Sequence, residues 1–339
     1  MQILIITNEL FDAEYSRLPF CNYLNEKGYH TADVAVLSNF AFSHAKIIHF
    51  HTSTKGIYQL INFIKSKNFS HIIIRSLRLV LHIGLLLPPG KKYLFYITGL
   101  GRLWGIHPTT ASSFVRSFIK LYLRTITKRL GAKYWFQNSD DPNDINLTGA
   151  IINGSGLDTY RLTKPKSLNK QILFAGRLEY YKGIKTLLEF VNIAYKYQYT
   201  TIICGKIGKL RNSDLNLLLS LIGKGAIEYH GFSKDVPALL LRSSFAVYPS
   251  ALREGIPRFI LESLAYGCIP IIPDIPGCRE ILNLARCVEL VETKTTVQKV
   301  SAIDQDIFTK YINHNSNLFN MRYSRHQVYK HMLQLLRSL

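Results

Sequence analysis

Acidic residues are scarce in this chain, whose 339 residues include 22 Asp and Glu against 42 Lys and Arg, a formal net charge of +20. This excess indicates a polyanion, an anionic membrane face or a phosphorylated substrate as partner, and charge alone does not choose among them. Cysteines are also few. The five are widely spaced without a C-x-x-C pair, which predicts neither a zinc site nor a disulfide framework, so we interpret them as reduced core thiols.

Long uninterrupted apolar runs are absent as well. The most apolar window, 71–90, is interrupted by Arg75, Arg78 and His82, whereas a membrane-spanning helix needs about 20 apolar residues. The opening MQILIITNEL has a short apolar run with no basic region before it, which favours a first strand over a signal peptide. We therefore expect no transmembrane segment and a cytoplasmic location.

What the sequence does contain is a regular alternation of β-rich and helical-period stretches. The β-rich runs of the first half are QILIIT, TADVAVL, KIIHF, HIIIR, KYLFYI and KYWFQ, and those of the second half are QILFAG, YTTIICG, AIEYHGF, FAVYPS, IPIIP and RCVEL. The alternation predicts the α/β class, with two Rossmann-like, doubly wound parallel-sheet domains and a cleft between them. We expect domains at 1–155 and 156–320 with a linker within 153–169. A C-terminal helix over 321–339 is expected to pack back toward the first domain.

Two glutamates in the second half stand where ligands are expected, at the carboxyl end of a strand. FAVYPS ends a strand at Ser250, and Glu254 occupies the loop before a helix that begins near Pro257 and carries Glu262. The helix N-terminus suits phosphate oxygens, while carboxylates accept hydrogen bonds from hydroxyls. The pattern predicts a pocket for a diphosphate and for sugar and ribose hydroxyls. The alternative is that Glu254 is a solvated loop charge and Glu262 a surface partner of Arg258, one turn earlier.

A second cluster, FAGRLEYYKG at 174–183, strengthens this interpretation. A strand ends at Gly176, and Arg177 and Lys182 follow before the next helix. A guanidinium provides a bidentate fork and an ammonium a point charge, a pair suited to holding a diphosphate. A solvated charge run is the alternative for this segment alone. The combination of strand-G-R-x4-K with a later E-x7-E is much more specific.

At these residues the sequence resembles glycosyltransferase family 4, the retaining sugar-nucleotide transferases of GT-B fold. The resemblance covers nearly the whole chain, through RLPFCNYLNEKGYH, ITGLGRLWG, FQNSDD, IINGSGLD, FAGRLEYYKG, HGF and REGIPR-x3-E with PGCRE. Its forms are most similar to the branch typified by bacterial undecaprenyl-diphospho-sugar N-acetylgalactosaminyltransferases. The resemblance implies an acceptor domain at the N-terminus and a nucleotide-sugar donor domain after it.

The resemblance also implies roles for the residues of the two clusters. Arg177 and Lys182 would bind the donor diphosphate, Glu254 a sugar hydroxyl and Glu262 the ribose, with the first three as the catalytic residues. Many relatives have Phe-Gly after the first glutamate, where this chain has Gly255-Ile256-Pro257, and Pro257 has no N–H to offer the sugar. The expected donor-contacting residues are Gly176, Gly255, Ile256, Pro257, Arg258 and Glu262.

The implied reaction moves an N-acetylhexosamine or hexose from a UDP-sugar to an undecaprenyl-diphosphate-linked saccharide with retention, in bacterial O-antigen, capsule or exopolysaccharide synthesis. The leaving phosphate itself would take the acceptor proton. Neither a metal nor another cofactor is expected, because no His, Asp and Glu residues cluster with metal-ligand spacing, and Asp140, Asp141 and Asp144 look like turn and capping residues. A non-catalytic sugar-nucleotide-binding protein is the alternative to an enzyme.

The acceptor side should come from the first domain. Arg17, Thr98, Gly99 and Asn138 all follow strands and are expected to face the acceptor, and Arg17 could meet its diphosphate. Arg17 could equally be a surface charge at a helix start, the TGLG glycines a turn, and Asn138 a cap. Relatives often carry a histidine or aspartate where TGLG stands, so a side-chain base is missing there.

A row of cations accounts for part of the positive charge. Arg116, Lys120, Arg124 and Lys128 recur every four residues in 111–130 with apolar residues between them, which predicts a helix with a basic stripe. Such a helix can rest on anionic lipid, so we expect a peripheral protein on the inner face of the cell membrane. The alternative to membrane contact is an ordinary solvated helix face. A nucleic-acid-binding module is the rival class, and only charge supports it because no binding motif or stacking aromatics accompany the cations.

Overall fold

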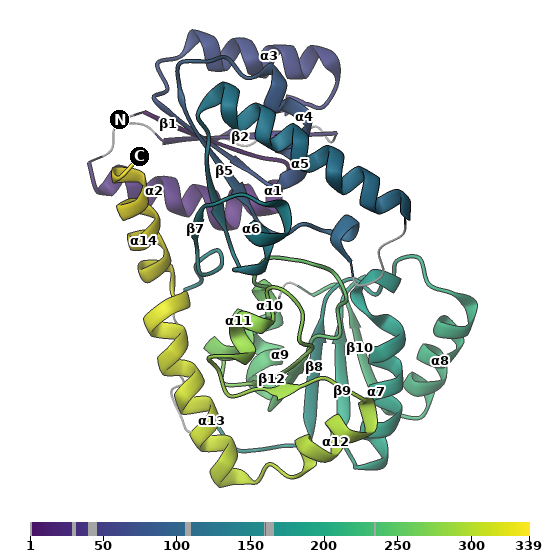
Figure 1. Ribbon diagram of the computed structural model, residues 1–339. Helices are drawn as coiled ribbons and strands as arrows, with labels where there is room; N and C mark the ends of the chain where they lie inside the picture. Colours follow the sequence, from purple (N-terminus) through teal and green to yellow (C-terminus); the bar gives the residue numbers. More distant parts are fainter. Residues whose placement is uncertain are drawn as a thin grey trace. The chain divides into compact units, whose positions relative to one another are not determined.

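The computed structural model describes residues 2–28, 32–39, 46–105, 110–158, 160, 166–233 and 235–339 (Figure 1). The chain divides into two compact units. The first consists of Met1–Gly156 and Val328–Leu339, and the second of Leu157–Gln327. Of the linker expected within 153–169, residues 159 and 161–165 lie outside the described ranges.

The described part of the first unit contains seven parallel strands in the order β3-β2-β1-β4-β5-β6-β7. They are β1 (Ile3–Thr7), β2 (Ala32–Ser38), β3 (Ile47–His51), β4 (His71–Arg75), β5 (Lys92–Ile97), β6 (Lys133–Phe136) and β7 (Ala150–Ile151). The helical segments are α1 (Leu10–Asp12), the π-helical turn η1 (Ala13–Arg17), α2 (Leu18–Glu26), α3 (Thr54–Ser66), α4 (Leu77–Ile83), η2 (Gly84–Leu86), η3 (Arg102–Trp104), α5 (Thr110–Leu130) and α6 (Asp140–Ile145).

Helices cover both faces of this sheet, which is why its strands are almost continuously apolar. Successive side chains of β1 point to opposite faces. Leu4 and Ile6 pack in one core with α3, α4 and α5, while Ile3 and Ile5 pack in another with α2 and the last helix, α14 (Arg325–Arg337). Tyr329 on α14 lies 5.0 Å from the Phe20 ring and so belongs to that second core.

The described part of the second unit contains six strands in the order β10-β9-β8-β11-β12-β13, all parallel. They are β8 (Gln171–Ala175), β9 (Thr200–Cys204), β10 (Ile227–Gly231), β11 (Phe245–Val247), β12 (Ile269–Ile272) and β13 (Val288–Glu289). The helical segments are η4 (Tyr180–Lys182), α7 (Ile184–Lys196), α8 (Asn212–Gly223), α9 (Val236–Arg242), α10 (Arg258–Ala265), α11 (Arg279–Leu282), α12 (Thr293–Ser301), α13 (Gln305–Leu318) and the π-helical turn η5 (Phe319–Tyr323).

Two apolar clusters enclose this second sheet in the same way. Ile172 and Phe174 of β8 pack with α7, α8, α12 and α13, while Leu173, between them, packs with α9, α10 and α11. The predicted α/β class with two doubly wound sheets is therefore confirmed. The short strand β7 was not expected. The segment DDPNDI forms the short helix α6 where only turn and capping residues were expected.

The structure also bears on the expectations for the cysteines and for membrane-spanning helices. All five cysteines are free thiols, and four of them are buried. Burial raises the pKa of the Cys21 thiol to about 12, so this thiol stays protonated. Within the described ranges, no helix combines the length and apolarity needed to cross a bilayer.

Candidate active site

The candidate site lies at the topological switch point of the second sheet. Strand β8 is flanked by β9 on one side and β11 on the other, so the connections leaving β8 and β11 start beside each other at the carboxyl edge. Open α/β sheets bind ligands at such a point because the connections diverge to opposite faces there. One connection carries Arg177 and Lys182, and the other carries Glu254.

Close backbone contact holds these two connections together. Gly183 follows Lys182 with φ +75°, and a Cβ on it would stand 2.0 Å from the carbonyl oxygen of Pro249. No side chain larger than hydrogen fits there, and the left-handed backbone also favours glycine. A second such contact lies behind the loop of Glu254, where a Cβ on Gly277 would stand 2.0 Å from the Gly255 carbonyl oxygen.

Lys182 and Glu254 meet across this junction. The Lys182 ammonium forms an ion pair with Oε1 of Glu254, and the Tyr248 hydroxyl donates a 2.7 Å hydrogen bond to Oε2. The ammonium also lies 5.8 Å from the centre of the Tyr248 ring. Both charged side chains remain partly exposed, at 19% for lysine and 33% for glutamate, so a ligand in solvent can reach them.

The Tyr248 hydroxyl is built to remain a proton donor. Burial raises the pKa of Tyr248 well above the ordinary tyrosine value, and the negative charge of Glu254 raises it further. The tyrosine therefore holds one carboxylate oxygen in place while the lysine holds the other. Because a carboxylate has about four acceptor positions, two remain for a ligand's hydroxyls.

The helix after this loop begins as expected. Pro257 is the N-cap residue of α10, with an extended backbone (φ −65°, ψ 129°), and Ile260 donates its N–H to the Pro257 carbonyl at 3.1 Å. Gly255, Ile256 and Pro257 are all buried. They pack this end of the loop against the unit, while Glu254, just before them, stays partly exposed.

The other two charged residues predicted to bind the donor, Arg177 and Glu262, have partners of their own. Arg177 Nη1 lies 3.1 Å from Glu179 Oε1, and the arginine side chain is 68% exposed. Glu262 accepts a 2.7 Å hydrogen bond from Nε of Arg258. The structure thus joins Lys182 with Glu254, while Arg177 and Glu262 each form a separate pair. Gly176, also predicted to contact the donor, directly follows β8 and donates its N–H to Cys204 O at 2.9 Å.

Residues 162–312 match the family profile described as "Glycosyl transferases group 1". The second unit is a group 1 glycosyl transferase domain. The predicted assignment of the chain as a glycosyltransferase is thereby confirmed. No curated protein matches the chain by sequence.

Solved structures agree with this transferase domain at the level of fold. HepE from Anabaena, in complex with UDP and glucose, aligns over 100% of both chains at 14% identity with a TM-score of 0.75. A glycosyltransferase from Rickettsia africae aligns over 99% of this chain and 98% of its own at 17% identity, with a TM-score of 0.73. WaaG, a glycosyltransferase involved in lipopolysaccharide biosynthesis, aligns over 97% and 98% at 10% identity, with a TM-score of 0.67. The transferase has the GT-B fold.

In the transferase's first unit, the residues predicted to face an acceptor serve varied local roles. Thr98 and Gly99 follow β5 and are half-buried, and Gly99 has φ +117°, which favours glycine. Asn138 is fully buried. Its Oδ1 accepts the N–H of Asp141 at 2.8 Å and its Nδ2 donates to the Asp141 carboxylate at 3.0 Å, so it caps the first turn of α6.

Arg17 differs from its expectation of an open position facing an acceptor. Its side chain is 2% exposed, because the chain turns it into the unit beside Asp12 and over the Tyr96 ring, 5.6 Å from the ring centre. Neither a surface charge at a helix start nor an exposed ligand contact describes it. It belongs to a buried network with Asp12 and Arg75.

The cations of α5 do not act as one row. Arg116 donates from Nε to the Leu103 carbonyl at 2.5 Å and stacks over the Trp104 ring at 5.6 Å, so it secures the turn η3 after TGLG. Arg124 and Lys128 are exposed and Lys120 is half-buried.

Apolar side chains accompany these cations on the outer side of α5. Phe114, Phe118 and Leu121 are 76%, 68% and 61% exposed at helical spacing, i, i+4 and i+7. Leu85 and Leu86 of η2 are also exposed, and η2 is bound to α5 through Tyr122, whose hydroxyl accepts the Leu85 N–H. We call the combination of Lys120, Arg124, Lys128, Leu85, Leu86, Phe114, Phe118 and Leu121 the outer face of α5.

Sequence reasoning missed two contributors to the site. Tyr248 stands in the strand-end segment FAVYPS, where an aromatic residue reads as core, and its hydrogen bond to Glu254 depends on how the loop turns back. Gly183 stands in the quoted motif, and its glycine-only contact with Pro249 depends on the neighbouring strand. The tyrosine hydroxyl directly before the Pro249-Ser250 pair was the only local signal.

Proposed function

We propose that this transferase moves a sugar from a UDP-sugar to an undecaprenyl-diphosphate-linked saccharide with retention of anomeric configuration. The sugar is an N-acetylhexosamine or a hexose, and the product belongs to a bacterial surface polysaccharide such as O-antigen, capsule or exopolysaccharide. The observation that carries the proposal is the Lys182–Glu254 pair at the switch point of a group 1 glycosyl transferase domain. The pair puts a diphosphate-binding cation beside a hydroxyl-binding carboxylate.

Lys182 and Arg177 are assigned to the leaving diphosphate. An ammonium has three N–H donors, and Glu254 uses one, so Lys182 can bind a phosphate oxygen without giving up its partner. Arg177 is largely exposed, and its only loss on turning to a phosphate is a solvated pair with Glu179, which contributes little. Positive charge placed where negative charge develops is the main electrostatic contribution to this class of reaction.

Glu254 is assigned to a hydroxyl of the donor sugar and Glu262 to the ribose. The N-terminal turn of α10 adds backbone amides near the diphosphate, and Pro257 is excluded as a donor because it has no N–H. In the reaction, the leaving phosphate takes the acceptor proton on the face from which it departs. No divalent metal and no other cofactor is needed in this scheme, since the cations of the chain neutralise the diphosphate.

UDP is the nucleotide we favour. HepE, whose fold this chain shares, was solved with UDP, with UDP and glucose, and with UDP-glucose. A surface-glycan pathway is favoured by the likeness to WaaG, which is involved in lipopolysaccharide biosynthesis. These likenesses are of fold, so donor and acceptor are tested directly.

The outer face of α5 supports a peripheral position on an anionic membrane, on the cytoplasmic side. Exposed phenylalanines beside lysine and arginine side chains are the composition that inserts shallowly into a lipid interface. Each cation near an anionic surface contributes about 1 kcal/mol. Because the acceptor is lipid-linked in this proposal, such contact would also bring the enzyme to its substrate.

A thermal-shift panel tests the donor. UDP, GDP and a set of UDP-sugars are added to the purified chain, and UDP with at least one UDP-sugar should raise the melting temperature more than GDP does. Transfer of that sugar to short lipid-diphosphate saccharides is then followed by mass spectrometry. Stabilisation by GDP alone, or by no nucleotide, would remove the UDP assignment.

Liposome sedimentation tests the membrane contact. The double variant Phe114→Ser, Phe118→Ser should bind vesicles of anionic lipid several-fold more weakly than the native chain, whereas Tyr58→Ser should not. Tyr58 is a suitable control because it is an equally exposed aromatic residue on α3. Equal binding by all three proteins would exclude the outer face of α5, and tight duplex DNA binding without liposome binding would favour the nucleic-acid rival.

A further inference from the structure

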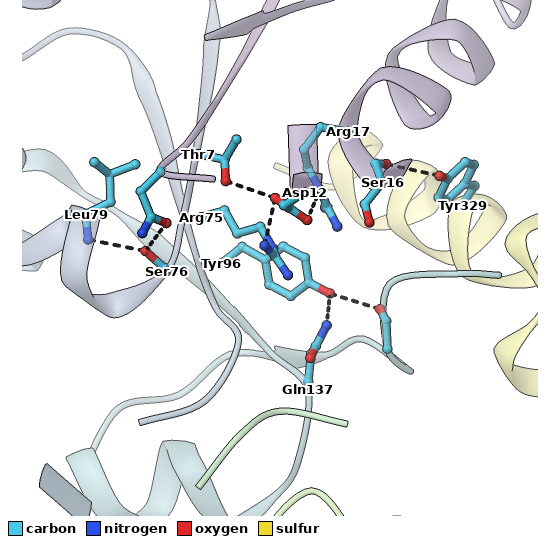
Figure 2. Close-up of polar contacts among 12 residues, drawn as sticks. Thr7, Asp12, Ser16, Arg17, Arg75, Ser76, Leu79, Tyr96, Gln137 and Tyr329 are labelled. Atoms are coloured by element: carbon cyan, nitrogen blue, oxygen red, sulfur yellow. Dashed lines mark hydrogen bonds and ion pairs between the residues drawn. The ribbon is translucent and has the colours of Figure 1, made fainter. Parts of the chain in front are cut away.

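A network of buried charges lies at the switch point of the first sheet. There β1 is flanked by β2 and β4, so the connections leaving β1 and β4 diverge from neighbouring strand ends. The network joins Asp12 and Arg17, which follow β1, to Arg75, the last residue of β4 (Figure 2). The position is equivalent to the one that carries Lys182 and Glu254 in the second sheet.

Asp12 is the centre of this network. Its Oδ2 accepts a 2.9 Å hydrogen bond from the Thr7 hydroxyl and lies 2.7 Å from Arg75 Nη1, while its Oδ1 lies 3.4 Å from Arg17 Nε. Burial raises the pKa of Asp12, but the charges of Arg17 and Arg75 outweigh burial and bring the pKa below its ordinary value. One ionised carboxylate therefore faces two guanidinium groups.

The two guanidinium groups have more donors than this carboxylate can satisfy. Within the described residues, Nη2 of Arg17 and Nε of Arg75 are buried without a hydrogen-bond partner. A buried charged donor left unpaired is costly, and native proteins seldom tolerate one without a reason. Glu9, the other acid that favours the charge on Arg75, is exposed and so lies outside the buried part of the network. The buried part of the network thus carries one positive charge in excess.

The backbone around the network is also unusual on both connections. Arg17 ends a π-helical turn, Ala13–Arg17, a rare conformation that is frequent at functional sites. Ser76, next to Arg75, has φ +87° although it is not glycine. Its N–H donates to Tyr96 O at 2.9 Å, and its hydroxyl donates to Asn8 Oδ1 at 3.1 Å. Strain of this kind persists where it positions functional groups.

We propose that this network is a binding site for a phosphoryl anion, with Arg75 as the contact residue and Arg17 as the second guanidinium behind it. Arg75 keeps 17% of its side chain exposed, so an anion from solvent can reach it without entering the core. Asp12 occupies only Nη1 of Arg75, and the planar fork matches the geometry of phosphate oxygens. Bound there, one anionic oxygen would balance the excess charge.

The phosphoryl group we assign to the site is the diphosphate of the lipid-linked acceptor, which rests on the proposed function. This assignment replaces the expectation that Arg17 itself faces the acceptor, because Arg17 is buried and Arg75 is the exposed member of the pair. Asp12 then acts as a positioning residue that fixes both guanidinium groups.

Calorimetric titration of the full chain with geranyl diphosphate, in saturating UDP, tests the site. UDP keeps the probe from the donor site, and geranyl diphosphate presents a lipid diphosphate without a saccharide. We expect binding in the native chain, a dissociation constant raised about tenfold or more in Arg75→Gln, the loss typical of a hydrogen bond to a charged group, and a smaller rise in Arg75→Lys. Arg78→Gln is the matched control, since it removes an exposed arginine three residues further along.

Several outcomes would overturn the inference. One is unchanged affinity in both Arg75 variants, and another is equal weakening in Arg78→Gln. Inorganic phosphate binding as tightly as geranyl diphosphate would exclude the acceptor as the source of the anion. Urea unfolding of each variant detects loss of fold. If Arg75→Gln does not fold, the affinity of Arg75→Lys decides, because a lysine ammonium can still pair with Asp12.

UDP binding measured on the same samples distinguishes failure of the anion site from failure of the proposed function. If UDP and a UDP-sugar bind normally but geranyl diphosphate does not, the anion site is wrong and the proposed donor chemistry stands. If no uridine nucleotide binds, the proposed function fails. UDP then cannot block the donor loop, so the geranyl diphosphate titration is repeated with the Lys182→Ala variant, in which the probe has lost that cation.

Discussion

Replacing Tyr248 with phenylalanine tests whether this residue, which directly follows β11, sets the position of Glu254 in the same connection. The substitution removes one hydroxyl, which donates a 2.7 Å hydrogen bond to Glu254 Oε2. The ring stays, and since Tyr248 is only 5% exposed, the phenylalanine ring fills the same space without a cavity. Any change in rate therefore reports the lost hydrogen bond.

The size of the effect follows from the surroundings of the carboxylate. A hydrogen bond to a charged group contributes about 1.5–3 kcal/mol, and water can replace part of it because Glu254 is one third exposed. We expect a loss of about 1–2 kcal/mol in transition-state stabilisation, a fall in kcat/KM of about 5- to 30-fold. The affinity for UDP should not change, since the hydroxyl contacts the carboxylate and not the diphosphate cations.

The pH dependence of this effect is also determined. Burial and the charge of Glu254 raise the pKa of Tyr248 well above its ordinary value, so the hydroxyl remains a donor throughout the usual assay range. The ratio of native to variant rates should therefore be constant between about pH 6 and about pH 9, below the ordinary tyrosine pKa of about 10.

The assay measures transfer or slow hydrolysis of the UDP-sugar that stabilises the native chain best. Tyr199→Phe is the matched control, because Tyr199 is an equally buried tyrosine of the same unit whose hydroxyl donates to the Val300 carbonyl, away from the site. A native rate in Tyr248→Phe, or an equal loss in Tyr199→Phe, would refute the reasoning.

Three further outcomes are expected. Lys182→Ala and Glu254→Gln should each lower turnover by about 2–4 kcal/mol of transition-state stabilisation, and near-native steady-state rates in both would end the proposed mechanism. Gly183→Ala should lower the free energy of unfolding by more than about 1 kcal/mol in urea, because its Cβ meets the Pro249 carbonyl in a left-handed backbone; an unchanged midpoint would contradict that contact. Asp12 has a lowered pKa, so the stability it contributes is present above the ordinary aspartate pKa of about 4 and is lost as pH falls through the folded value. Asp12→Asn should therefore destabilise the chain at neutral pH and reduce the loss of unfolding free energy between neutral and acidic pH, measured by urea titrations at a neutral and an acidic pH. An unchanged pH dependence in the variant would refute the role given to Asp12.

The order of strands and helices could be predicted because each element has a local sequence pattern. Buried parallel strands need continuous apolar runs, helices need their own period, and glycine or proline stands at the boundaries, as at Pro257 before α10. Once the alternation is established, the end of each expected strand is known to within a few residues, and parallel strands bring their carboxyl ends to one edge. That is why Lys182 and Glu254, 72 residues apart, could be expected at one site.

The partner of each side chain could not be predicted in this way. Whether Arg17 faces solvent or the core depends on the π-helical turn that carries it and on the Tyr96 ring beneath it, which comes from a strand 79 positions later. Tyr248 reads as a core aromatic residue until the loop after β11 turns back and presents Glu254 to its hydroxyl. Burial, charge balance and hydrogen-bond partners arise between elements distant in sequence, so only the packed chain decides them.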